Sequence, residues 1–456
     1  MSALRLQLAV VAARLVAFAV RSFGHSGTSL PGKTLLAIDS QAIRMLAQRL
    51  QLGTVIISAT NGKTTTASLT ASALNKAGIR SVHNREGANM AGGIAAALAD
   101  RRAGEDTSAL GLFEVDEFWL DGLAPQLMPK AVLLGNLFRD QLDRYGEMDS
   151  ISARWRSAAQ TLTDSGCQLL LCADDPMIAA IGADLPNVRW FGIEDRSVAL
   201  EHLPHAADSI SCRDCGSELV YETVLLGHLG HWHCPNCGIC RPTVDYAVTN
   251  IRIDGAQGST FTISSDGVSQ VVELPLPGLY NIYNALGAWA LCDTIGLNSE
   301  QISEGFAGAK AASGRAESFD LDGCKTTLML IKNPTGANEV LRTLSTESEA
   351  LNLAIVLNDR IADGRDISWV WDADFETLAG KTSSVWVGGT RASEMALRLR
   401  YAGFGADCIH VEPGVEPLLE RALSDGPSRL WVLPTYTALA EVVAAIESRV
   451  QVESPR

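Results

Sequence analysis

The sequence lacks the features that mark a nucleic-acid-binding chain or an exported one. Its 37 Lys and Arg are outnumbered by 52 Asp and Glu, giving a net charge of −15, and no basic run is present. Binding to a phosphate backbone depends on clustered cations, so nucleic acid is excluded as a partner. No cleavable export signal is apparent, and four of the ten cysteines fall in two C-x-x-C pairs. We therefore expect a reducing, cytoplasmic setting rather than a disulfide framework.

A long uninterrupted apolar run is also missing from the N-terminal segment LRLQLAVVAARLVAFAV. Arg5, Arg14 and Arg21 interrupt it, the apolar stretches between them are too short to span a bilayer, and no A-x-A-like site follows. We expect a helix that either packs on the protein or touches a membrane surface. Amphipathic helices usually bury their apolar face in their own protein, which favours packing.

The length of 456 residues is too great for one core and indicates two or three domains. From Leu52, short apolar runs alternate with helical stretches, which predicts parallel βαβ units with ligands at the carboxyl ends of the strands. A Cys-rich insertion over 208–243 breaks the alternation, and a second alternating region begins near Ser318 after the expected linker AGAKAASGRAES. The predicted α/β organisation is an N-terminal helix and connector over 1–50, a central domain over 51–310 and a smaller Rossmann-like domain over 316–456.

The segment VIISATNGKTTTAS reads as a strand, a tight turn and a helix start. This arrangement places backbone N–H groups and a helix N-terminus around an anion, with Lys63 reaching the β- and γ-phosphates of a nucleotide and the Thr64 hydroxyl binding Mg²⁺. The standard loop has Gly where this chain has Ile57, so the motif is a shorter variant. A bare G-K-T also occurs in ordinary turns, but the strand before it and the helix after it favour phosphate binding.

The stretch TNGKTTT resembles the nucleotide loop of the Mur ligases and folylpolyglutamate synthases, ATP-dependent enzymes that join a carboxylate to an amine through an acyl phosphate. Ala59 stands where that family commonly has Gly. The resemblance continues in order through nearly the whole chain from about Leu52, in HNREGANMAGG, FEVDE, NLFRDQLDRYGEMD, LCADDP, LYNIYNALGAWA and SGRAES. It implies a Mur ligase-type central domain that binds ATP, followed by the family's C-terminal domain.

The same resemblance implies the residues of the ATP site. Lys63 and Glu114 would be catalytic, and Glu114 would bind Mg²⁺ together with Thr64, as suits an ion that prefers hard oxygen ligands. Without the surrounding motifs, Glu114 would read as an exposed acid at a strand end. The remaining implied nucleotide contacts are Asn61, Gly62, Thr65, Asn89 near the γ-phosphate or substrate, Asn281 near the adenine, Arg315, and Lys332 and Asn333 of the KNPTG loop.

The cysteines of the insertion have the spacing C-x2-C-x18-C-x2-C, formed by Cys212, Cys215, Cys234 and Cys237. Two such knuckles suit a four-thiolate zinc site, and with no open coordination position the ion would be structural. The alternatives are a redox dithiol or two disulfides, and Cys240 could replace Cys237 as a ligand. We expect the nearby histidines to be surface residues rather than ligands; they are His228, His231 and His233.

The combination of this core with the insertion, EGANM and ADGRDISWVWD closely resembles the MurT family, ligase subunits that form lipid II isoglutaminyl synthases with the glutaminase GatD. The resemblance implies a heterodimer that amidates the α-carboxylate of D-Glu in the lipid II stem peptide. About fifty residues before the phosphate loop leave no room for a domain that binds a UDP-linked substrate. A lipid-carried substrate fits this, and an N-terminal helix near the inner face of the membrane is compatible with it. The alternatives are an amino-acid-adding ligase of the Mur or folylpolyglutamate type and a non-catalytic ATP-binding zinc-ribbon scaffold.

A glutaminase needs an activated cysteine, and no cysteine outside the insertion lies in a sequence typical of one, so a separate partner is predicted. In the MurT pattern the second Asp of D-G-R-D, here Asp366, completes a Cys-His-Asp triad whose Cys and His belong to that partner. Asp363 is expected instead to cap the following helix. Trp369 and Trp371 are expected to pack in the core or in an interface.

Overall fold

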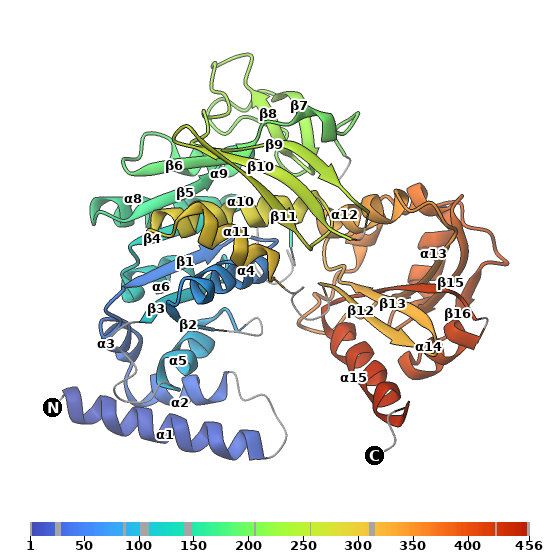
Figure 1. Cartoon of the computed structure of the whole chain (residues 1–456), viewed down its shortest axis with the longest axis horizontal. Helices are drawn as coiled ribbons and strands as arrows, with labels where there is room; N and C mark the ends of the chain where they lie inside the picture. Colours follow the sequence, from blue (N-terminus) through green and yellow to red (C-terminus); the bar gives the residue numbers. More distant parts are fainter. Residues whose placement is uncertain are drawn as a thin grey trace.

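The computed structural model describes residues 2–22, 29–84, 88–100, 109–140, 148–204, 207–255, 257–309, 315–424 and 426–453. Elements up to residue 309 surround a nine-stranded sheet, and those from residue 315 onward surround a six-stranded sheet (Figure 1). Each sheet has its own buried apolar core. The predicted linker lies partly outside the described residues.

Within residues 2–22 and 29–53, which the structure describes, three helices precede the first strand: α1 (Ser2–Ser22), α2 (Leu30–Ile38) and α3 (Ala42–Ala47). The predicted connector is therefore itself largely helical, with Pro31 in the first turn of α2, where its missing N–H costs no hydrogen bond. The helix α1 packs on α2 and on α5 (Ala91–Ala99). Of the helices that the structure describes, none has both the length and the apolar character required to cross a bilayer.

The large sheet has the order β11-β10-β9-β6-β5-β4-β1-β3-β2. The parallel strands are β1 (Thr54–Ser58), β2 (Arg80–His83), β3 (Ala109–Glu114), β4 (Ala131–Leu134), β5 (Gln168–Cys172) and β6 (Val188–Ile193). The strand β9 (Tyr246–Ile253) pairs in parallel with β6 and antiparallel with β10 (Ser259–Ser265), which pairs antiparallel with β11 (Val268–Leu274). The segments YAVTNIRI and STFTISS thus form neighbouring antiparallel strands at one side of the sheet.

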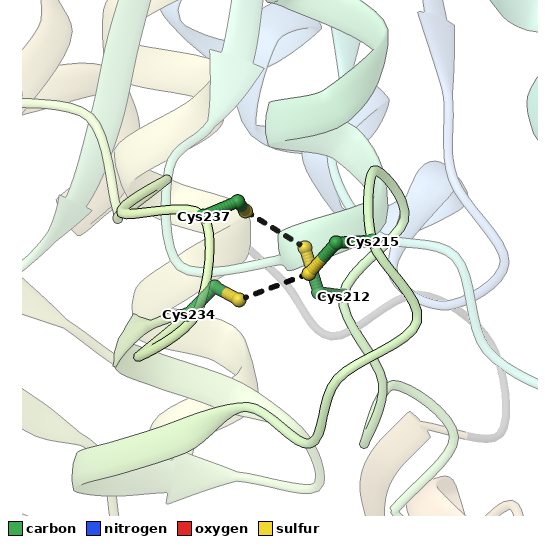
Figure 2. Close-up of side chains that lie close together, drawn as sticks. All are labelled: Cys212, Cys215, Cys234 and Cys237. Atoms are coloured by element: carbon green, nitrogen blue, oxygen red, sulfur yellow. Dashed lines mark hydrogen bonds between the residues drawn. The ribbon is translucent and has the colours of Figure 1, made fainter.

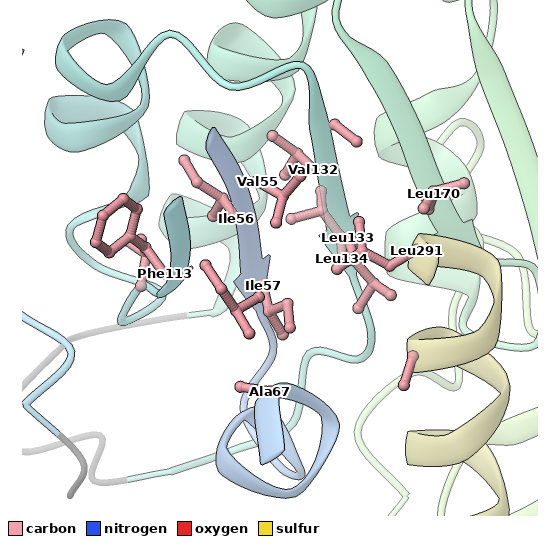
Figure 3. Close-up of a cluster of buried hydrophobic side chains, with 14 of the residues drawn as sticks. Val55, Ile56, Ile57, Ala67, Phe113, Val132, Leu133, Leu134, Leu170 and Leu291 are labelled. Atoms are coloured by element: carbon pink, nitrogen blue, oxygen red, sulfur yellow. The ribbon is translucent and has the colours of Figure 1, made fainter. Parts of the chain in front are cut away.

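The centre of this sheet is buried on both faces, which is why its strands read as continuous apolar runs. All five residues of β1 are buried. Val55, Ile57 and Leu133 lie in one cluster with Ala67 of α4 (Lys63–Lys76) and Leu291 of α10 (Leu279–Thr294) (Figure 3). Among the described residues, the other helices of this body are α6 (Leu120–Leu127), α8 (Met148–Asp164), α9 (Pro176–Gly182) and α11 (Ser299–Ala307). The core fixes the carboxyl end of β1, from which the phosphate loop emerges.

The short helix η2 (Arg196–Val198) follows β6 in the chain. The Cys-rich insertion comes next and contains the hairpin of β7 (Val220–Leu226) and β8 (Leu229–His233). The expectation that all three of its histidines lie at the surface is wrong. His228 and His231 are buried, because the hairpin packs against the central body: the Gly230 N–H donates to the Asp174 carbonyl over 2.9 Å, and His231 Nε2 lies 2.8 Å from the Ile193 carbonyl.

The second sheet has the order β12-β13-β17-β14-β15-β16, with β12 antiparallel to β13 and the others parallel. Its strands are β12 (Arg315–Leu321), β13 (Cys324–Met329), β14 (Leu351–Val356), β15 (Thr382–Gly388), β16 (Ile409–Val411) and β17 (Arg429–Pro434). Its helices are α12 (Pro334–Ser345), η3 (Ser368–Trp371), η4 (Phe375–Leu378), α13 (Ala392–Tyr401), α14 (Val415–Ser424) and α15 (Tyr436–Glu453). The predicted second α/β region is confirmed.

Candidate active site

The phosphate loop, residues 59–63, connects β1 to α4 and depends on one glycine. Gly62 has φ +89°, a backbone conformation that favours glycine, and a Cβ on it would lie 1.9 Å from Asn284 Oδ1 and so displace that side chain. Asn136, which follows β4, holds the loop from the other side. Its Oδ1 accepts from the Asn61 N–H over 2.9 Å, and its Nδ2 donates to the Asn61 carbonyl over 3.0 Å.

The ammonium group of Lys63 is buried in this loop. Its Nζ lies 2.7 Å from Glu117 Oε2 and also contacts the carbonyls of Ala59 and Thr60. Burial alone lowers the pKa of Lys63, but the carboxylates of Glu117 and Asp116 outweigh it and raise the pKa above the ordinary value. Lys63 therefore carries a full positive charge. Glu117 and Asp116 belong to FEVDE but were not predicted as site residues, and only the run of acids after a buried strand could have pointed to them.

Glu114 and Thr64 are brought together as predicted for a magnesium site. The Thr64 hydroxyl donates to Glu114 Oε2 over 2.9 Å, and His83 Nε2 lies 3.3 Å from Glu114 Oε1. The Asn84 side chain fixes the end of β3 by accepting from the Glu114 N–H over 2.9 Å. A hydroxyl and a carboxylate at the head of the phosphate loop are the hard oxygen donors that Mg²⁺ takes beside a nucleotide, so the residues fit this ion.

A cavity of about 110 Å³ lies between the two bodies, at the phosphate loop. Its walls include Asn61, Gly62, Thr65, Tyr280, Tyr283 and Asn284 from the central body and Lys332, Thr335, Gly336 and Glu339 from the second body. Asn281, predicted near the adenine, does not line it. The Asn281 side chain donates to the Pro277 carbonyl over 2.7 Å and accepts from Asn284 over 3.1 Å, so it supports the lining residue one turn further on.

The KNPTG loop of the second body contacts the phosphate loop directly. Asn333 Nδ2 donates to Asn61 Oδ1 over 2.9 Å, while Asn333 Oδ1 accepts from the Gly336 N–H over 2.8 Å and caps α12. Lys332 Nζ lies 2.5 Å from Asp140 Oδ2 and 3.3 Å from the Thr60 carbonyl. Two cations, Lys63 and Lys332, therefore approach the loop from opposite bodies.

Three further residues bear on this site: Asn89 and Arg315, which were predicted as nucleotide contacts, and Glu339, which was not. The Asn89 carbonyl accepts from the Asp116 N–H over 3.0 Å, which places Asn89 beside the acids after β3. The Arg315 side chain lies outside the described residues. Glu339, which sequence reasoning did not select, is fully buried in the cavity wall, and burial raises its pKa to about 7 although Arg342 opposes the shift. Glu339 lines the cavity only because α12 packs against the central body, and the sequence does not reveal that contact.

Asp366 lies in a second cavity, of about 80 Å³, next to the first. Arg139, Asp140, Lys332 and Asn333 line one part of it, and Asp363, Asp366, Ser368, Trp369 and Asp372 line the other. Lys332 borders both cavities. The Asp366 carboxylate is exposed and accepts from the Ser368 N–H over 2.8 Å, and this bond with that from the Ser368 side chain lowers its pKa. Asp366 is thus an ionised, accessible carboxylate beside the first cavity.

The expectation that Asp363 caps the following helix is wrong. Its buried carboxylate accepts from the Thr437 N–H over 2.7 Å, from the Thr437 hydroxyl and from the Arg360 N–H over 3.1 Å. Asp363 therefore caps α15, which is remote in sequence, and Asp366 takes the local position before η3. Trp369 packs against the core as predicted, whereas Trp371 is half exposed and meets Tyr401 edge to face.

The four predicted cysteine ligands converge (Figure 2). Their sulfurs all lie within 4.8 Å of one another, with Cys212 and Cys237 3.5 Å apart and Cys215 and Cys234 3.4 Å apart. A tetrahedral zinc ion with Zn–S bonds of about 2.3 Å spaces its sulfurs about 3.8 Å apart, so the thiols fit such an ion. Cys240 is not in the cluster; its backbone forms a bridge with that of His233. The geometry therefore selects Cys237 over Cys240.

Four cysteines outside the cluster have the environment of packed thiols. Cys167, Cys172, Cys292 and Cys324 are buried, and burial raises the pKa of each; that of Cys167 reaches about 12. Cys408 is half-buried. A nucleophilic cysteine needs the opposite shift, so these four buried thiols are not suited to glutamine hydrolysis.

Comparisons with known proteins agree with this architecture. Residues 57–230 match the family described as Mur ligase middle domain, and residues 330–439 match MurT ligase C-terminal. The chain is 33% identical over 448 residues to the lipid II isoglutaminyl synthase (glutamine-hydrolyzing) subunit MurT of Streptococcus pneumoniae (strain ATCC BAA-255 / R6), covering 98% of each chain. It is 32% identical to the subunit of the same name from Staphylococcus aureus (strain N315), covering 95% of this chain and 96% of the relative. Among solved structures, a pseudomurein peptide ligase type C from Methanothermus fervidus superposes with a TM-score of 0.68 at 21% identity, over 91% of this chain and 84% of that one.

Proposed function

The chain belongs to the MurT family of Mur ligases, and on that premise we propose that it is the ligase subunit of a glutamine-hydrolysing lipid II isoglutaminyl synthase. Its reaction is the ATP-dependent amidation of the α-carboxylate of D-Glu in the lipid II stem peptide, a step of peptidoglycan biosynthesis. The γ-phosphoryl group of ATP passes to the carboxylate to give an acyl phosphate and ADP. Ammonia then attacks the acyl carbon, and phosphate leaves as D-isoglutamine forms.

The observation that carries this proposal is the phosphate loop beside the cavity between the two bodies. Asn61 and Gly62 of the loop line the cavity together with Lys332 of the second body, which also reaches the Thr60 carbonyl, and Thr64 meets Glu114 directly after the loop. The two cations, Lys63 and Lys332, together with the N–H groups at the start of α4, are suited to bind the phosphates and to stabilise charge on the transferring group. Thr64 and Glu114 would hold Mg²⁺, which when bound supplies further neutralisation of the phosphate charge. Asn61, Gly62, Thr65, Asn89 and Asn333 are the other proposed nucleotide contacts.

Zinc bound by Cys212, Cys215, Cys234 and Cys237 is the structural part of the proposal. Two knuckles of the same design support it: Gly216 and Gly238 both have positive φ, and each donates its N–H to the carbonyl of the first cysteine of its pair. The hairpin that extends from this cluster ends at Leu226 and Leu229, which line the nucleotide cavity. A zinc ion would therefore fix one wall of the cavity without taking part in the chemistry.

A separate glutaminase subunit is proposed to supply the ammonia. The burial of four thiols outside the cluster supports an external nucleophile. The ionised carboxylate of Asp366 is exposed, so a partner's histidine can reach it, and the role assigned to it is to orient that imidazole. The partner's glutaminase site would then face the cavity at Asp366, next to the cavity where the ligase reaction uses ammonia. Ammonia would therefore have only a short distance to travel between the two sites.

Amidation of lipid II by the complex of this chain with its glutaminase subunit tests the proposal. The assay contains glutamine, ATP and Mg²⁺, and the amidated product is quantified by mass spectrometry. Lys63→Ala is expected to lower turnover by about 10²–10³-fold, because it removes a cation aimed at the transferring phosphoryl group. Lys76→Ala is the matched control, because Lys76 lies on the same helix but pairs with Glu304 at the surface. Full activity of Lys63→Ala would overturn the assignment of the phosphate loop. Incorporation of an amino acid in place of ammonia would indicate an amino-acid-adding ligase instead.

A further inference from the structure

The helix α1 has a row of large apolar side chains on its outer face. Leu4, Leu8, Val11, Leu15 and Phe18 are between 54 and 74 % exposed. Their spacing of three or four residues places all five on one side of the helix, since an α-helix turns once every 3.6 residues. Figure 1 shows α1 at the outer edge of the molecule, with α2 on one side of it. We call these five residues the outer row.

The opposite face of the same helix accounts for its attachment to the protein. Leu6, Ala9, Ala13 and Ala17 are buried, and α1 packs on α2 and α5 through this face. Small side chains predominate there, whereas the large ones are in the outer row. The helix is therefore apolar on two sides although only one side is needed for folding, and a continuous exposed apolar row of this kind marks a contact surface.

The charged residues of α1 lie along the borders of the outer row. Arg5 falls on one side of it, and Arg14 and Arg21 fall on the other, by their positions around the helix. Arg5 and Arg14 donate to the carbonyls of Ile38 and Ala99, and Arg21 pairs with Asp100. The helix contains no acid, in a chain whose net charge is −15. This part of the surface therefore has the charge that an anionic surface attracts.

We propose that α1 binds the protein to the surface of an anionic phospholipid membrane, lying in the plane of the interface. The outer row would enter the boundary between headgroups and acyl chains, and the arginines on both sides would meet lipid phosphates, the arrangement of interfacial amphipathic helices. A second copy of the chain is less suited to cover the outer row, because packing two such faces together would bring the arginines of both copies close to one another and make them repel. The inference deepens the proposed function by giving the enzyme access to a lipid-carried substrate, and it rests on that function for its biological role only.

Co-sedimentation of the full chain with vesicles tests the binding without any turnover. Vesicles of phosphatidylglycerol and phosphatidylcholine should bind it, and vesicles of phosphatidylcholine alone should bind it much less, because the arginines contribute only at an anionic surface. The double substitution Leu8→Glu with Leu15→Glu should lower binding by about tenfold or more, since it puts two charges into the apolar row. Both positions are exposed, so the fold should persist, and thermal unfolding verifies it.

The matched control is Val268→Glu with Val271→Glu. These valines, on β11, are 60 and 59 % exposed, so the control introduces the same charges at positions of similar exposure far from α1 in the sequence. It should leave vesicle binding unchanged. Equal binding to both kinds of vesicle, or equal binding of wild type and the α1 variant, would overturn the proposal. So would a dimer in analytical ultracentrifugation that the α1 variant abolishes, because the outer row would then be covered by a second copy.

Activity measurements separate this inference from the proposed function. The α1 variant, combined with its glutaminase subunit, should amidate a soluble short-chain lipid II analogue at the wild-type rate and lipid II embedded in anionic vesicles several-fold more slowly. Loss of activity on both substrates would show that the helix serves folding or catalysis and would count against membrane docking. Vesicle binding that persists in a wild-type protein with no synthase activity would refute the proposed function and leave the docking surface in place.

Discussion

Replacing Asp366 by Asn should separate the two halves of the proposed reaction. The change preserves the size of the side chain and removes only its charge and its ability to fix the tautomer of a partner's histidine. Loss of that third triad member costs about 10⁴-fold in turnover where it has been measured in a serine protease, and we expect a loss of about 10²–10⁴-fold in glutamine hydrolysis here. The exposed carboxylate accepts one backbone N–H, from Ser368. The free energy of unfolding should therefore change by less than about 1 kcal/mol.

Ammonium chloride supplied in place of glutamine makes this test decisive. Asp366 borders the second cavity but not the nucleotide cavity. The Asp366→Asn complex should therefore amidate lipid II at close to the wild-type rate with ammonium and fail only with glutamine. Unchanged glutamine hydrolysis would refute the triad role. Loss of the ammonium-dependent rate as well would mean that Asp366 belongs to the ligase site.

Asp363→Asn is the matched control, since it makes the same chemical change three residues away. Asp363 is buried and accepts from two N–H groups and a hydroxyl. An amide can satisfy only part of this set, and losing bonds to a buried carboxylate costs about 2–4 kcal/mol. Asp363→Asn should thus be clearly destabilised in chemical denaturation, whereas Asp366→Asn should unfold like the wild type. A reversed order would contradict the description of this loop.

The metal cluster and the buried Glu339 give two further tests. Cys212→Ser should lose one equivalent of zinc, measured by mass spectrometry, and should unfold at a lower temperature. Cys240→Ser should keep the metal because its thiol lies outside the cluster. Zinc loss in Cys240→Ser but not in Cys212→Ser would contradict the choice of ligands. Glu339 has its pKa raised from 4.5 to about 7, so the folded state is favoured by protonation: its contribution is complete below pH 4.5 and is lost as the pH rises to about 7. Without nucleotide, Glu339→Gln should therefore gain up to about 3 kcal/mol of stability over the wild type at pH 8 and almost none at pH 4.5. A difference that does not change with pH would contradict this.

The sequence predicted the parts of the site that are local. The strand, glycine turn and helix start around Lys63 follow from consecutive residues, and so do the two knuckles around Cys212 and Cys234. Glu114 was identified by the resemblance of FEVDE to the family's acidic segment, and its contact with Thr64 bears out that these two residues lie together. Such features depend on spacing and on backbone conformation, both of which are written in short segments.

Features that depend on two remote segments were missed or assigned wrongly. Glu117 was passed over because its pairing with Lys63 requires the end of β3 to meet the phosphate loop. Asp363 was predicted to cap the helix that follows it in sequence, but its carboxylate accepts from the Thr437 N–H of α15 instead. His231 was expected at the surface rather than as a ligand, but its hairpin packs against the central body and buries it. Tertiary contacts decided each case, and spacing along the chain carries no information about them.

The position of the Cys-rich insertion has a consequence for how the chain folds. Strands β6 and β9 are adjacent in the sheet, yet residues 194–245 separate them in sequence. Closing a loop of this length carries an entropic cost that must be met before the pairing stabilises anything, so this pairing should form late. The two knuckles and the hairpin are joined by contacts close in sequence and can form first. A metal ion that fixes them early would shorten the free chain between β6 and β9, so refolding should be faster when zinc is present, and the nine-stranded sheet should be completed last at its β9–β11 side.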